Sequence, residues 1–277
     1  MPLTASVRHQ IVMRIYHETN TFLEKCFHSL EAPVPAPTAI KQGDGFILRY
    51  KEEHQCLELA IVQKLARYIS GLNASLLLLE SGYTQELGAI FRTLDEFQED
   101  IAFLALPIVS DVEFSETHKK YLDDFFQEEF DNPNNAILST QKRDGVPRKK
   151  IWAVIASSGK SGLNPHDQRE LSRTISQTYS GYVHGASCHI CEMIGGKPLR
   201  YFLSGMAGTY RQSEFTYNYW DYAYRGLISV ILSAKALGNA DIVEKGYNFI
   251  EYFEKTTGDT GSGDPEELIK KSKRKNS

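Results

Sequence analysis

Three charged residues share one side of a segment with a helical pattern. Arg92 and Glu96 are four residues apart, and Glu99 follows three residues later, so their side chains project from one face of a helix. That face adjoins apolar residues of the same segment, among them Phe91 and Leu94. A buried arginine needs a carboxylate partner, whereas a solvated pair at this spacing contributes only about 0.3–0.5 kcal/mol. The pattern fits both an internal polar network and a solvated surface pair.

A histidine lies in a second segment that departs from helix rules. His184 is preceded by Ser180-Gly181 and followed by Gly185, and small residues in the middle of a helix lower its propensity. Close approach of another helix or of a ligand would compensate for this loss of helix propensity. Histidine has the ordinary pKa closest to neutral and is suited to general acid or base chemistry. The simpler interpretation is a satisfied core or surface histidine.

Together these residues predict one polar cluster formed by two helices. The cluster has three central and three supporting members: Arg92, Glu96 and His184, with Glu99, Tyr179 and Tyr182. In an interaction or sensing protein such a cluster specifies the core. In a metal-independent nuclease, His184 would exchange protons, Arg92 would stabilise the phosphorane charge, and Glu96 or Glu99 would orient one of them. We take the first function as the main hypothesis and the nuclease as the alternative.

Two cysteines extend the histidine segment at helical spacing. His184, Cys188 and Cys191 stand at i, i+4 and i+7, which could present three zinc ligands on one face. Structural zinc sites draw ligands from two elements, and the chain has no second pair of this kind. Buried free cysteines explain the same residues. We therefore expect no metal and no cofactor. The Gly-Lys-Ser triplet at residues 159–161 lacks the first glycine of a phosphate-binding loop.

The periodicity of apolar residues predicts an all-α fold, a helical bundle of about seven to nine helices with an N-terminal helical arm. The expected helices cover about residues 5–30, 47–79, 83–106, 115–130, 165–194, 215–236 and 240–253, and residues 151–156 fit helix or strand equally well. Pro33, Pro35 and Pro37 interrupt the first helix pattern. We expect an N-terminal helix at 1–31, a Pro/Gly linker at 32–46, a helical bundle domain at 47–256 and a disordered basic tail at 257–277.

Composition narrows the class of protein. A net charge of −4 over 277 residues predicts no broad affinity for nucleic acid or anionic membrane. Four scattered cysteines indicate a reducing compartment, the N-terminus lacks a secretory apolar run, and no stretch approaches the ~18 apolar residues of a membrane span. We expect a cytoplasmic protein that does not enter membranes. Its expected partner is another protein or a second copy of itself, with RNA as an alternative through the basic residues 270–275.

The stretch Gly82 to Glu96, with its Phe-Arg-Thr-Leu-x-Glu core, resembles a bacterial helical family known only as a domain of unknown function. The later segment Tyr179 to His184 matches the same family, and the resemblance covers about residues 50–194. It implies a helical bundle that brings an arginine, a carboxylate and a histidine together. Some such families are similar to the HEPN superfamily, whose active members are RNases of toxin and phage-defence systems. Their signature places an arginine four to six residues before the histidine, whereas Arg173 here lies eleven residues before His184.

Overall fold

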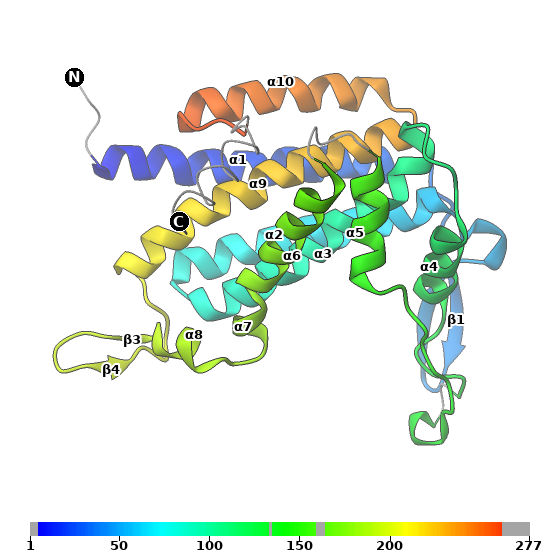
Figure 1. Ribbon diagram of the computed structural model, residues 1–277, viewed down its shortest axis with the longest axis horizontal. Helices are drawn as coiled ribbons and strands as arrows, with labels where there is room; N and C mark the ends of the chain where they lie inside the picture. Colours follow the sequence, from blue (N-terminus) through cyan, green and yellow to red (C-terminus); the bar gives the residue numbers. More distant parts are fainter. Residues whose placement is uncertain (1–4, 133–134, 159–163, 262–277) are drawn as a thin grey trace.

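The computed structural model describes residues 5–132, 135–158 and 164–261, and it confirms the all-α helical bundle (Figure 1). In chain order, its helices and strands are α1 Ala5–Glu31, β1 Thr38–Gln42, β2 Gly45–Arg49, α2 Leu57–Ser81, α3 Thr84–Val109, α4 Glu116–Phe126, α5 Arg148–Ser157, α6 Pro165–Thr178, α7 Ser180–Val183, α8 Ser187–Cys191, β3 Ile194–Gly195, β4 Arg200–Tyr201, α9 Tyr210–Ala236 and α10 Ala240–Thr257. Short 3-10 turns cover Glu52–His54 and Ala136–Leu138. The uncertain segment 151–156 is therefore helical.

The core forms around α9, which packs against α1, α2, α3 and α10 (Figure 1). The apolar stripe of α2 explains this packing, since Leu65 and Leu72 are fully buried in it. Helix α1 contributes Ile15, Tyr16 and Leu23 to the same core, all essentially inaccessible to solvent. The first helix is thus an integral part of the bundle, whereas the sequence suggested an arm. The apolar residues of α1 form one continuous face, and the neighbouring helices cover it.

The predicted hairpin of α2 and α3 is present, and its turn depends on two glycines. Gly82 ends α2 in the left-handed region at φ 75°, and Gly205 lies against it at φ 88°. A Cβ on Gly82 would stand 2.2 Å from the backbone nitrogen of Ala207, inside any allowed contact. The backbone N–H of Met206 donates to the Gly82 carbonyl at 2.7 Å. The turn therefore fixes the segment before α9 against the α2–α3 hairpin.

Replacing Gly82 by alanine should lower the free energy of unfolding far more than the same change at Gly238. Both glycines have positive φ, at 75° and 67°, but a Cβ on Gly238 meets nothing within 4 Å. Gly238→Ala should cost about 1 kcal/mol from the left-handed conformation alone. Gly82→Ala should cost about 2 kcal/mol more because it also forces a backbone clash. Urea unfolding of both variants measures this difference, and equal losses would contradict the close contact.

Helix α3 continues three residues beyond Leu106, where the sequence predicted its end at Pro107. A proline inside a helix leaves the carbonyl four residues earlier without its N–H donor. Here the carbonyl of Phe103 accepts a hydrogen bond from Nε2 of His118 at 3.3 Å instead. The His118 ring also stacks on the Phe103 ring at 4.1 Å, and burial lowers its pKa. A neutral histidine from α4 thus satisfies the group that Pro107 leaves free.

The long helix predicted over residues 165–194 is instead three helices, α6, α7 and α8 (Figure 1). The chain turns at Gly185, which adopts φ 62° and cannot continue a helix. Gly181 leaves room for the ring of His189, which would lie 1.9 Å from a Cβ there. The glycines and serine that lower helix propensity therefore mark real breaks. The predicted register of His184 with the residues that follow it is lost at Gly185.

The segment predicted as a Pro/Gly linker contains an antiparallel hairpin of β1 and β2. Gln42 pairs with Gly45 at its tip, and Gly43 takes φ 58° at the first position of the two-residue turn. The predicted basic tail lies outside the described residues from position 262 on, as does the Gly-Lys-Ser triplet at residues 159–161. Residue Thr257, placed in that tail by sequence, is the buried last residue of α10. No described helix has the length and apolar content that crossing a bilayer requires.

Candidate functional site

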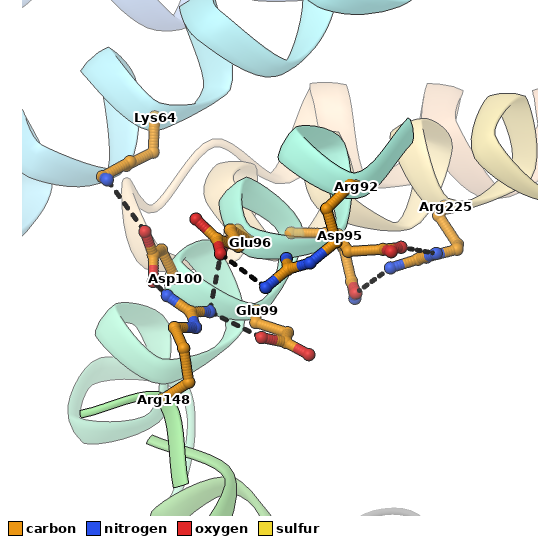
Figure 2. Close-up of polar contacts among 9 residues, drawn as sticks. Lys64, Arg92, Asp95, Glu96, Glu99, Asp100, Arg148 and Arg225 are labelled. Atoms are coloured by element: carbon orange, nitrogen blue, oxygen red, sulfur yellow. Dashed lines mark hydrogen bonds and ion pairs between the residues drawn. The ribbon is translucent and has the colours of Figure 1, made fainter. Parts of the chain in front are cut away.

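Helix α3 carries three buried acidic residues, Asp95, Glu99 and Asp100, in addition to its apolar face. Each carboxylate pairs with at least one cation from a helix other than α3 (Figure 2). We call the whole set the α3 charge network, and its members are Lys64, Arg92, Asp95, Glu96, Glu99, Asp100, Arg148 and Arg225. The network joins α3 to α2, α5 and α9. Because buried charges are costly when unpaired, these contacts constrain how the four helices pack.

Arg148, at the first position of α5, binds two of the acids at once. Its Nη2 donates to Glu99 Oε2 at 2.6 Å and to the backbone carbonyl of Glu96 at 3.2 Å. Its Nη1 pairs with Asp100, which also accepts from Nζ of Lys64 at 2.8 Å. The planar guanidinium is suited to this forked arrangement. Arg148 thereby fixes the start of α5 on the middle of α3.

Lys64 lies within the apolar stripe of α2 and is held by aromatic rings as well as by Asp100. Its ammonium stands 4.9 Å from the ring centroid of Phe125, 5.4 Å from that of Phe97 and 5.6 Å from that of Tyr121. These distances fall within the range of cation–π attraction. Lys64 therefore connects the charge network to α4.

Arg225, from the middle of α9, forms the second half of the network (Figure 2). Its Nη1 donates to Asp95 Oδ1 at 2.7 Å, and its Nη2 donates to Gln98 Oε1 at 3.0 Å. The hydroxyl of Tyr222 donates to the same Asp95 oxygen at 3.1 Å. The Arg225 guanidinium lies 5.1 Å from the Tyr222 ring centroid. Asp95 itself is completely buried.

The electrostatics of the network follow from desolvation opposed by pairing. Burial raises the pKa of Asp95, and the attraction of Arg225 partly opposes the shift. Burial likewise raises the pKa of Glu99, and Arg148 opposes it. Each arginine thus stabilises the charged form of a carboxylate that burial alone would favour as neutral.

The structure brings Arg92 and Glu96 together but not His184. Arg92 Nη2 lies 2.8 Å from Glu96 Oε1, and the Glu96 side chain is 40% exposed. His184 is exposed where α7 ends, and no hydrogen bond or ion pair within the described ranges joins it to either residue. Glu99 binds Arg148, not the predicted histidine. The three central residues therefore do not converge, and their catalytic role stays a prediction.

The two supporting tyrosines are neighbours, with ring centroids 5.8 Å apart. Tyr182 packs against Gly88 of α3, and its hydroxyl donates to Glu192 Oε2 at 2.6 Å. Its ring lies 4.2 Å from the ring of His189, whereas the predicted cluster grouped Tyr182 with His184. Tyr179 contacts Phe91 edge-on, with ring centroids 5.5 Å apart.

The three weak metal-ligand candidates do not lie on one continuous helix. His184 lies before the turn at Gly185, and the free cysteines Cys188 and Cys191 lie beyond it in α8, both exposed. In the described part of the chain, no group of three or more histidine, cysteine or acidic side chains is arranged to hold a metal ion. The predicted i, i+4, i+7 geometry assumed one continuous helix.

A cleft of about 490 Å³ opens beside the charge network between α3, α6 and α9, and we call it the α3–α6–α9 cleft. Its lining residues are Gln98, Glu99, Ala102, Ile155, Gln168, Ser172, Ile175, Thr178, Tyr179, Trp220, Asp221, Tyr222, Tyr224, Arg225 and Gly261. Glu99 and Arg225 belong to both the network and the cleft. Ligand pockets of this size combine apolar and aromatic walls with a few polar groups, as this cleft does.

The fold and the site define an all-helical bundle with an internal ion-pair network beside an aromatic-walled cleft. Comparison of the chain with protein-family models, with curated proteins and with solved structures finds no match in any of the three. The function must therefore be inferred from the site itself.

Proposed function

We propose that the chain is a sensing module that binds a small ligand in the α3–α6–α9 cleft. The observation that carries the proposal is the sharing of two charged residues between cleft and network. Glu99 reaches Arg148 of α5, and Arg225 reaches Asp95 of α3, while both side chains also line the cleft. A ligand that contacts either residue therefore acts directly on the contacts that position α5 and α9 against α3.

The energetics of the network make this coupling effective. Its charges are partly desolvated, so a small displacement of one partner changes the interaction energy more than it would in water. A ligand shifts a conformational equilibrium only by its difference in affinity for the two states. Contact with a residue that holds two helices together supplies such a difference. In this proposal, ligand binding changes the packing of α5 and α9 against α3. An interaction partner then binds one of the two packing states in preference to the other.

The proposal is tested by thermal unfolding with a panel of small compounds of four classes: amines, carboxylates, sugars and nucleotides. A ligand at one hundred times its Kd should stabilise the protein by about 2.7 kcal/mol and raise Tm by about 5 °C. The variant Ser172→Trp fills the cleft wall and should abolish the shift. Thr174→Trp, on the exposed side of the same helix, should retain it. If no class raises Tm, or if Ser172→Trp responds like the natural protein, the proposal is wrong.

A further inference from the structure

We infer that the α3–α6–α9 cleft selects an organic cation, an amine or a quaternary ammonium ion, and that Asp221 is the carboxylate that recognises it. This inference rests on the proposed function, because it names the ligand class of the same cleft. It goes beyond that function in assigning the charge of the ligand and the residue that selects it.

The charge balance of the cleft is the first observation. Arg225 is already neutralised by Asp95 at 2.7 Å, and its other terminal nitrogen donates to Gln98. Glu99 is neutralised by Arg148 at 2.6 Å. Asp221 lines the same cleft and makes no hydrogen bond or ion pair with any described residue. Among the described residues that line the cleft, the existing pairs therefore leave one negative charge uncompensated.

Aromatic rings supply the second observation. Tyr179, Trp220, Tyr222 and Tyr224 all line the cleft, and the rings of Trp220 and Tyr224 stack with centroids 5.0 Å apart. The negative faces of aromatic rings attract cations within about 6 Å of the centroid. The protein already uses this attraction here, since Arg225 lies 5.1 Å from the centroid of Tyr222. Aromatic rings that line a site together with a carboxylate are suited to binding amines and quaternary ammonium ions.

The surroundings of Asp221 favour an incoming cation over an anion. Although solvent reaches Asp221, the side chains around it raise its pKa by desolvation, and Arg225 only partly opposes that shift. A bound cation would replace the hydration that Asp221 has lost. An anion would instead meet both Asp221 and Glu99. Arg225, the cation among the described lining residues, is already paired with Asp95.

The inference is tested by calorimetric titration of the full chain with choline and with n-butylammonium. The uncharged isostere 3,3-dimethylbutan-1-ol and the anion butyrate serve as matched probes. We expect at least one cation to bind at least tenfold more tightly than both uncharged and anionic probes. Asp221→Asn should weaken cation binding at least tenfold and leave the uncharged probe unaffected. Asp241→Asn, at an exposed carboxylate of α10 outside the cleft, should change nothing.

Tyr224→Leu provides an independent variant, because it removes a ring and keeps the carboxylate. It should weaken binding of the quaternary cation by severalfold, with Tm of each variant confirming that it is folded. Equal affinity for choline and its isostere, unchanged affinity in Asp221→Asn, or no binding of either cation would overturn the inference. Binding of a sugar, nucleotide or carboxylate that Ser172→Trp abolishes would overturn the inference while the proposed function stands. A panel without any binder would overturn both.

Discussion

Replacing Arg148 by methionine should lower the free energy of unfolding at pH 7 by about 3–5 kcal/mol, because it leaves buried carboxylates without their shared cation. Glu99 loses its hydrogen-bonded partner at 2.6 Å, while Asp100 retains Lys64 at 2.8 Å. Methionine keeps the apolar stem and removes the charge. Urea unfolding at pH 7 measures the loss.

The chain offers a matched control for this variant. Arg143 also binds two carboxylates, Asp124 at 3.2 Å and Glu129 at 2.8 Å, but its side chain is 39% exposed against 23% for Arg148. Exposed pairs contribute about 1 kcal/mol or less. Arg143→Met should therefore have a small effect, and similar losses in the two variants would show that Glu99 is not desolvated.

The loss in Arg148→Met should also depend on pH. Burial raises the folded-state pKa of Glu99, and removing Arg148, which lowers it, raises it further. A carboxyl group with a raised folded pKa binds more protons in the folded state. Its stabilising contribution is therefore complete below the unfolded pKa of about 4.3 and is lost as pH rises through the folded value. The deficit of the variant should shrink between pH 7 and pH 4, and Glu99→Gln in the same chain should reduce it at pH 7.

Removing both partners of the Asp95–Arg225 pair should cost less than removing either one. Arg225→Met leaves Asp95 buried beside Tyr222, and Asp95→Leu leaves a desolvated guanidinium, so each should lose about 3–5 kcal/mol. The double variant leaves no uncompensated charge. A double-mutant cycle on urea unfolding should therefore give a coupling energy of at least about 3 kcal/mol.

Arg92 and Glu96 form the control pair for this cycle. Their 2.8 Å contact is almost as short as the 2.7 Å between Asp95 and Arg225, but Glu96 is 40% exposed and Asp95 is fully buried. Their coupling should be about 0.3–0.5 kcal/mol. Equal coupling in both cycles would contradict the assignment of Asp95 and Arg225 as an internal pair.

Sequence periodicity predicted the helices whose buried stripe is long and regular. Leu65 and Leu72 identify α2 because a 3.6-residue repeat must bury one face, and the same signal identifies α3 and α9. The positions where a helix ends were harder to predict. The weak helix propensity of Gly181 and Gly185 was visible in the sequence, but only the positive φ of Gly185 and the packing of His189 show that the helix ends there.

The charge network shows why the candidate site was only partly predictable. The contact of Arg92 with Glu96 follows from helical spacing, and it is present. Glu99 and Arg148 are 49 positions apart, and no local pattern connects them. A usable signal existed, because acids beside the buried apolar face of a helix require cations from elsewhere. If α3 is buried, its cation partners should lie next to other apolar stretches. Lys64, Arg148 and Arg225 are cations in such positions.

The most direct test of ligand binding in the α3–α6–α9 cleft uses the two tryptophans of the chain. Trp220 lines the cleft, and Trp152 of α5 does not. In a ¹H–¹⁵N spectrum, with Trp152→Phe assigning the two indole signals, a compound that raises Tm should shift the Trp220 signal in a saturable manner and by more than the Trp152 signal. A shift of Trp152 alone, or of neither signal, with every stabilising compound would contradict the proposed site.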